Sequence, residues 1–398
     1  WLEALPGDAE ARRDDPIMLR LTTQLANVYR SLDRLSDARE LDEDTLVRER
    51  RVLGLEHPRT LMTARSYGAD LRLVGDFEEA LLTDSATWQL ADQTMGRDHL
   101  LTITASGNLA LSELLAGEPE HALQRRRDHD LPWCERFEKQ RPEESAWVLG
   151  HIGILQRELG RYPEALASLR DAKQAFERSA PGGTTAPSSQ MALLVESGIA
   201  IVERRLGRPQ PDTNWRILEE CRAAFGETSP LMWAIILSLA GDLAAAGQPG
   251  EAVRKAQQAL QGHSSFFGPN HPFTWISQVD LGNYALAAGQ LGLADEMSRS
   301  AHASLESSLG PRHLWTLAAA VARANVLAVT GHPDDAAALE EPVLGEYRKR
   351  LGAGNPLTRA VMENDRHTRR LRNEPGSVAD PAGEAARRRS IELDIPPY

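Results

Sequence analysis

The sequence repeats itself with a period of 42 residues, and this self-similarity constrains the fold more than any other feature. The joint segment at 54–61 returns in related form at 96–103, 268–275 and 310–317. A fixed period of this length indicates a stack of small units in which each unit packs only on its neighbours. Because a stack presents a long curved surface, the repeat by itself favours a binding scaffold.

Each unit has the pattern of two amphipathic helices joined by a tight turn. A small residue precedes the turn by seven positions, and in seven of the eight units an alanine follows it by five. Glycine suits the left-handed residue that closes a helix, and small residues let paired helices approach closely. The expected turn residues are Asp33, Gly75, Gly117, Gly160, Gly207, Gly247, Gly289 and Gly331.

This spacing of small residue, turn and alanine resembles the tetratricopeptide repeat, whose usual period is about 34 residues. The longer form, with its Leu-Gly-x-x-His-Pro-x-Thr-Leu joint, is similar to kinesin light chain repeats. Segments 38–46 and 50–54 resemble actinobacterial tetratricopeptide proteins of FxSxx-COOH peptide systems and the C-terminal halves of NB-ARC (STAND-type) switch ATPases. The resemblance covers about residues 14–370. It implies an all-α, right-handed superhelical solenoid of about eight repeats, closed by a C-terminal capping helix.

We expect the chain to have a front half and a back half. Residues 1–178 carry about four repeats, and residues 190–372 carry about four more and the capping helix. Between them, the Pro-, Gly- and Ser-rich segment 179–189 replaces the usual joint with a flexible insertion. This segment is either a structural seam or a tolerated surface insertion. The polar composition of 373–398 predicts an extended or disordered tail, and the start at Trp1 suggests a fragment of a longer chain.

The composition excludes some functional classes. A formal net charge of −12 and a pI of about 5.5 argue against nucleic-acid binding. No apolar run approaches the roughly 20 residues that a membrane span needs. Cys134 and Cys221 form no CxxC pair, so a reducing cytoplasm is the simplest setting.

No catalytic motif, cofactor motif or metal site is visible, so we expect no enzyme activity and no cofactor. The joint histidines share one repeat position, and neighbouring repeats lie about 10 Å apart, whereas zinc ligands lie about 2.0–2.3 Å from one ion. We therefore expect each histidine to bond nearby backbone, and the joint threonines to satisfy free helix-start amides. These residues are His57, His99, His271 and His313, with Thr60, Thr102, Thr274 and Thr316.

The resemblance places the first helix of each unit along an inner groove. Three positions before the turn, four of the first five units carry an arginine, and other arginines share that face. Arginine forks bind carboxylates at two points, so this groove would suit an acidic partner. The alternative is that the arginines pair with acidic neighbours such as Glu158 and Glu203. The candidate groove residues here are Arg20, Asn27, Arg30, Arg65, Arg72, Asn108, Arg157, Arg204 and Arg205.

The back half offers an apolar inner face with Asn283 and Asn325 among its residues. An asparagine amide bonds a peptide backbone in both directions, so this face suits an extended or helical peptide. The alternative is that its residues pack on adjacent helices. Kinesin light chain repeats carry an asparagine two positions before the small residue; among the eight units only Asn108 matches.

The terminal segment 391–398 alternates apolar and acidic residues before two prolines. Alternation fits an added strand or an extended docked peptide. Either this acidic end lies in the arginine-lined groove of its own or a neighbouring molecule, or it is a loose tail.

Together these features predict a non-catalytic scaffold that binds a protein or peptide in its concave groove. The resemblance suggests a sensor or adaptor in a bacterial regulatory or peptide-maturation system. The alternative is the C-terminal, ligand-sensing arm of a STAND-type, nucleotide-dependent switch.

Overall fold

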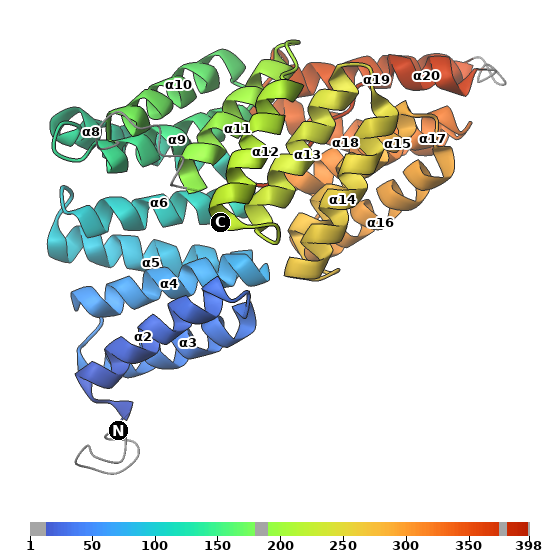
Figure 1. The fold of residues 1–398 in the computed structure, drawn as a ribbon. Coiled ribbons are helices and arrows are strands. Elements are labelled where there is room, and N and C mark those ends of the chain that lie inside the picture. The colour runs from blue at the N-terminus through green and yellow to red at the C-terminus, as the bar shows by residue number, and fades with distance from the viewer. Residues whose placement is uncertain (1–12, 180–189, 374–379, 397–398) are drawn as a thin grey trace. The chain divides into compact units, whose positions relative to one another are not determined.

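The computed structural model describes residues 13–179, 190–373 and 380–396, and these contain helices and connecting segments but no strand (Figure 1). The chain divides into two compact units, one ending at Phe137 and the other running from Glu138 to Pro397. This division falls earlier than the seam expected at 179–189. Apart from Ser179, that expected insertion lies outside the described residues.

Unit 1 consists of consecutive helices, each packed on the next. They are α2 (Pro16–Ser31), α3 (Leu35–Val52), α4 (Pro58–Val74), α5 (Phe77–Met95), α6 (Leu100–Leu115), α7 (Pro119–Arg125), the π-helical segment η2 (Arg126–Asp130) and α8 (Leu131–Phe137).

Unit 2 continues the same pattern. Its helices are α9 (Pro142–Glu158), α10 (Tyr162–Ser179), α11 (Gln190–Arg205), α12 (Pro211–Phe225), α13 (Pro230–Ala245), α14 (Pro249–Phe267), α15 (Pro272–Ala287), α16 (Leu291–Leu309), α17 (Leu314–Val329), α18 (Pro333–Leu351), α19 (Pro356–Asn373) and α20 (Pro381–Arg387). Alternate helices from α9 to α19 also contact one another. The all-α stack of helix pairs predicted from the repeat is therefore confirmed within each unit.

The turns inside the helix pairs have the predicted left-handed backbone. Asp33 has φ 59°, and the seven turn glycines have φ between 68° and 87°. A residue with a Cβ is strained in this region, which is why glycine holds the position in every unit but the first.

The joints between pairs are closed by histidines. Each joint histidine stands at the N-cap, and its Nδ1 accepts a hydrogen bond from the backbone amide two residues later. The expectation that these histidines bond backbone is therefore confirmed. The amides belong to Arg59 (3.2 Å), Leu101 (3.1 Å), Phe273 (3.1 Å) and Trp315 (3.2 Å).

The joint threonines do something else. The hydroxyls of Thr102 and Thr274 donate to the carbonyls of Gly96 and Gly268, at 2.9 and 2.7 Å. The expectation that they satisfy free amides is wrong, because the histidine already caps the helix. Thr102 and Thr274 instead tie the start of one helix to the end of the helix before it, whereas the buried hydroxyls of Thr60 and Thr316 make no such bond.

Unit 2 closes on itself. Asn355, which takes the histidine's place at the last joint, accepts a bond from the amide of Leu357 at 2.9 Å and so caps α19. Its amide also donates to the carbonyl of Leu159, at the end of α9, at 2.7 Å. The first and last repeats of unit 2 therefore touch, and the first helices of its pairs surround one inner face.

Candidate functional site

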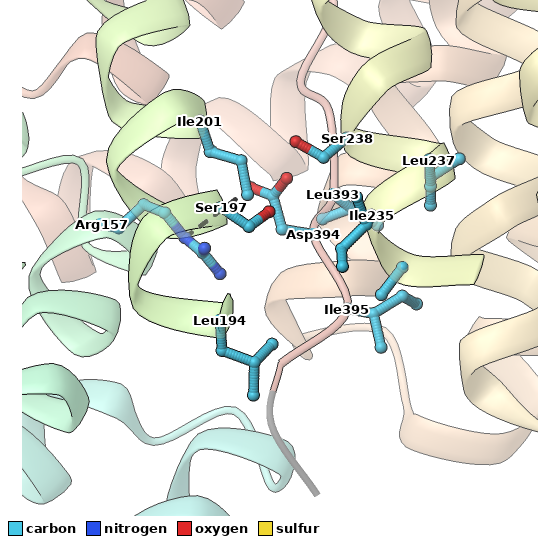
Figure 2. Close-up of a pocket in the computed structure, with 11 residues that line it drawn as sticks. Arg157, Leu194, Ser197, Ile201, Ile235, Leu237, Ser238, Leu393, Asp394 and Ile395 are labelled. Atoms are coloured by element: carbon cyan, nitrogen blue, oxygen red, sulfur yellow. Dashed lines mark ion pairs between the residues drawn. The ribbon is translucent and has the colours of Figure 1, made fainter. Parts of the chain in front are cut away.

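The inner face of unit 2 is covered by the C-terminal segment 388–396, which follows α20 without regular secondary structure and runs as an extended trace in Figure 2. Side chains from α9, α11, α15, α17 and α19 bond to this segment. The sequence hypothesis of an acidic end in an arginine-lined groove describes this arrangement, with the groove belonging to the same chain.

Five inner-face side chains bond the backbone of the segment, one of them Arg205, which donates to the carbonyl of Glu392 at 2.9 Å. Asn364 bonds Arg389 in both directions, since its amide donates to the Arg389 carbonyl and its oxygen accepts from the Arg389 amide, both at 2.8 Å. Asn325 donates to the same carbonyl at 3.1 Å, and Asn283 donates to the carbonyl of Ile391 at 3.3 Å. Asp280 accepts from the amide of Leu393 at 3.0 Å. These bonds recognise an extended main chain whatever its side chains are.

Three arginines surround the acidic side chains of the segment. Glu392 lies 3.1 Å from Arg204 and 3.3 Å from Arg205. Asp394 lies 3.2 Å from Arg205, 3.7 Å from Arg204 and 3.8 Å from Arg157. The side chains of Arg157 and Arg204 are only 5% and 4% exposed, so these ion pairs are largely withdrawn from water.

Burial and charge act in opposite directions on the acidic groups here. Burial raises the pKa of Asp394, but Arg157, Arg205 and Arg204 together bring it below its usual value. The pKa of Asp280 is raised well above its usual value, first by burial and then by the nearby carboxylate of Glu392. The site therefore favours a charged carboxylate at Asp394 and a protonated one at Asp280.

The apolar residues of the segment alternate with its acids. Ile391, Leu393 and Ile395 are all buried. Figure 2 shows Leu393 and Ile395 lining a small pocket together with residues of α11 and α13, the helices that contribute its apolar wall. That wall consists of Leu194, Ile201, Ala234, Ile235 and Leu237.

The start of the segment is held separately. Arg388 is buried and lies 3.2 Å from Glu340 on α18 and 3.0 Å from Glu384 on α20. It also donates to the hydroxyl of Thr368 at 2.8 Å. This anchor is distinct from the arginine cluster at the other end of the segment.

The candidate residues from the sequence separate between the two units. Arg157, Arg204, Arg205, Asn283 and Asn325 come together around the segment in unit 2. The remaining candidates lie in unit 1 and do not join that site: Arg20, Asn27, Arg30, Arg65, Arg72 and Asn108.

The unit 1 arginines are engaged with their own helices. Arg72 is buried and pairs with Asp84 and the Ser112 hydroxyl. Arg30 lies 2.5 Å from Asp42 and 2.6 Å from Asp70. The structure therefore corrects the expectation of an open groove arginine at Arg72, because packing α4 against α5 and α6 encloses its guanidinium.

The other candidates of unit 1 are less constrained. Asn27 is exposed and accepts a bond from Arg30 at 2.5 Å, while Asn108 donates to the backbone carbonyl of Arg65 at 3.2 Å. Burial lowers the pKa of the half-buried Arg65. Arg20 is exposed on α2.

Two acidic residues, Glu158 and Glu203, were the alternative partners expected for the groove arginines, and both form ion pairs. Glu158 pairs with Arg157 at 2.8 Å, as that alternative expected. Glu203 pairs instead with Arg170 at 2.8 Å and Arg208 at 2.5 Å, which leaves Arg204 to the segment and to Asp242.

Sequence reasoning missed Asp280 and Asn364 as binding residues. Both hold the repeat position two before the small residue, two periods apart. Asn108 holds the same repeat position. Extending this position into the capping helix α19 would have predicted Asn364 as a binding residue.

Within the described part of the chain, no group of three or more His, Cys, Asp or Glu side chains could hold a metal ion. Among those same residues, no helix is long and apolar enough to cross a membrane. Both cysteines are buried, and burial raises the pKa of Cys221 to about 11.

Comparison with known proteins supports the repeat assignment in both units. A family model described as the tetratricopeptide repeat matches residues 18–83 and 233–307. These two stretches therefore match the tetratricopeptide repeat. No curated protein sequence matches this chain.

Among solved structures, the chain is similar to a Rap protein complexed with competence and sporulation factor. The TM-score is 0.52 at 11% identity, over 93% of this chain and 99% of that one. At this identity the likeness shows a shared fold.

Two other solved structures have lower TM-scores. A STAND protein with a tetratricopeptide repeat sensor from Pyrococcus horikoshii gives 0.44 at 14% identity, over 87% of this chain and 52% of that one. A putative kinesin light chain from Podosopora anserina gives 0.24 at 16% identity, over 73% and 96%.

Proposed function

We propose that the protein is a non-catalytic scaffold that binds a protein or peptide, in extended form, on the inner face of unit 2. One observation carries the proposal: a peptide segment already lies there, bonded through its main chain by Asn283, Asn325 and Asn364. None of these four bonds depends on which side chain the bound segment carries. A peptide from another molecule can therefore make the same bonds.

The fold supports this role. Stacked tetratricopeptide units present long surfaces suited to other macromolecules, and the similar Rap protein was solved in complex with competence and sporulation factor. The arginine cluster favours an acidic partner, since buried guanidinium groups form strong, two-point bonds with carboxylates.

The cellular role that fits best is that of a sensor or adaptor in a bacterial regulatory or peptide-maturation system, acting in the cytoplasm. This follows from the resemblance of segments 38–46 and 50–54 to actinobacterial tetratricopeptide proteins.

A display library of linear peptides tests the binding role when it is selected on the full chain carrying Glu392→Arg and Asp394→Arg, in which the arginine cluster repels the chain's own segment. We expect enriched peptides whose affinity falls at least about tenfold when Asn283→Ala and Asn325→Ala are combined, since each lost bond is worth about 1 kcal/mol. Asn27→Ala, an exposed asparagine in unit 1, is the matched control and should leave affinity unchanged. Failure to enrich any peptide, or equal binding to the double variant, would refute the proposed site.

A further inference from the structure

We infer that the inner face of unit 2 selects extended peptides in which apolar and acidic residues alternate, and that segment 389–396 is a tethered copy of such a ligand which a partner must displace. This inference rests on the proposed function and names its ligand class and its regulation.

The ligand class follows from the two-residue period of the contacts. In an extended chain, successive side chains point to opposite sides. Glu392 and Asp394 meet the arginines, while Ile391, Leu393 and Ile395 are buried. Ser390 is exposed, so the selective contacts begin at Ile391. A ligand shifted by one residue would place apolar groups against guanidinium groups, and carboxylates against the apolar side chains of α11 and α13.

The arginine cluster also requires an acidic occupant. Arg157 and Arg204 have acidic partners on the scaffold, Glu158 and Asp242. Within the described chain, both ion pairs of Arg205 are with the bound segment, at Glu392 and Asp394. Its side chain is 14% exposed with the segment bound, and removing the segment takes away both of these ion-pair partners. An apolar or basic peptide would not restore them.

The bonds of Arg388 keep the start of the segment in place, so the rest of the segment can leave the inner face and return to it. Arg388 bonds α18, α19 and α20, and none of those bonds involves the arginine cluster. Residues 390–396 can therefore leave the inner face while Arg388 stays in place. A segment held so close to its site has an effective concentration on the order of millimolar. The apparent affinity of any competing peptide falls in proportion to the ratio of this concentration to the segment's own dissociation constant.

The probe for this inference is a fluorescein-labelled synthetic peptide with the sequence of residues 389–398. Its affinity is measured by fluorescence anisotropy for two forms of the full chain: the wild type and the variant with Glu392→Arg and Asp394→Arg. In that variant the segment is repelled by the arginine cluster, and we call it the released variant. We expect the variant to bind the probe at least about tenfold more tightly than the wild type.

The matched control carries the same change of charge at two exposed acids, Glu40→Arg and Glu306→Arg, and should bind the probe as weakly as the wild type. Circular dichroism checks that each variant keeps its helices. If the double reversal unfolds the chain, Glu392→Gln with Asp394→Asn replaces it, with the same expected direction.

Removal of single charges then tests the ligand class. Adding Arg205→Ala to the released variant should weaken binding of the probe, because both carboxylates of the probe lose a guanidinium that they pair with. A probe with glutamine and asparagine in place of its two acids should bind the released variant less tightly than the acidic probe does.

The outcomes separate the inference from the proposed function. Equal binding of the probe to wild type and released variant would overturn the tethered-ligand inference, while peptides selected from the library would still support the scaffold role. If library peptides bind but the probe binds neither form, the ligand class is overturned. If neither library peptides nor the probe bind, the proposed function fails as well.

Discussion

Arg72 and Arg205 both carry a guanidinium on the first helix of a repeat, but their partners differ. Arg72 is enclosed between Asp84 and Ser112 of its own unit. Arg205 instead pairs with Glu392 and Asp394 of the C-terminal segment. A buried charge needs a partner, so the source of that partner decides whether the arginine is structural or available for binding.

Replacing Arg72 should therefore destabilise the fold. Arg72→Ala leaves Asp84 buried without its cation, which costs about 3–5 kcal/mol. Chemical denaturation of the full chain, followed by circular dichroism, measures this loss. The exposed Arg20→Ala is the control and should leave the transition where it is. Equal, small effects of both substitutions would mean that Arg72 is not structural.

Asp280 should make the stability of unit 2 depend on pH. Its raised pKa means that the folded chain holds this proton to a higher pH than the unfolded chain does. Its contribution is therefore full below the ordinary carboxyl pKa of 3.8 and is lost as the pH rises above it. Asp280→Asn keeps an oxygen for the Leu393 amide but cannot ionise next to Glu392 and Asp394.

We expect the melting temperature of the asparagine variant to rise relative to that of the wild type between pH 4 and pH 8. Thermal unfolding of both proteins in matched buffers measures the difference. A difference that is constant across this range would show that Asp280 holds no unusual proton.

At the scale of the helix, capping and turn chemistry explain why the elements could be predicted. Left-handed turn residues and N-cap histidines act through bonds to nearby backbone, so their effect is visible in a short stretch of sequence. The partner of Arg72 could not be predicted in the same way, because Asp84 comes from another helix whose rotation is set by packing. The binding position of the C-terminal segment was harder still to predict. The alternation at 391–395 is visible in the sequence, but the residues that contact the segment lie as far away in sequence as Arg157.

The joint histidines offer a local test of this account. His99 is exposed, so its cap can be removed without disturbing a core. His99→Ala should leave the Leu101 amide unbonded and weaken the start of α6 by about 1 kcal/mol. His99→Asn should restore the cap, since Asn355 performs that task at the last joint. Hydrogen exchange of the Leu101 amide distinguishes the two, and equal exchange in both variants would contradict the capping role.

At the scale of the whole molecule, the two units share one repeat but differ in how their inner-face residues are used. In unit 1, Arg30 and Arg72 join neighbouring helices to one another. In unit 2, the bond between Asn355 and Leu159 brings the first and last repeats together, and the C-terminal segment lies on the face that they surround. The repeat predicted a stack but not this closure, because closure depends on small rotations that accumulate over successive repeats.

Opening the closure should release the C-terminal segment. Asn355→Asp keeps an oxygen that caps α19 but loses the amide that donates to the Leu159 carbonyl. The arginine cluster stands on α9 and α11, whereas the asparagines that bond the backbone stand on α15, α17 and α19. A segment that spans both groups is held best when the two groups keep their spacing. We therefore expect faster hydrogen exchange at the Leu393 amide, which bonds Asp280, together with faster exchange in the α9–α10 turn. Faster exchange in the turn with unchanged protection at Leu393 would show that the segment is held without the closure.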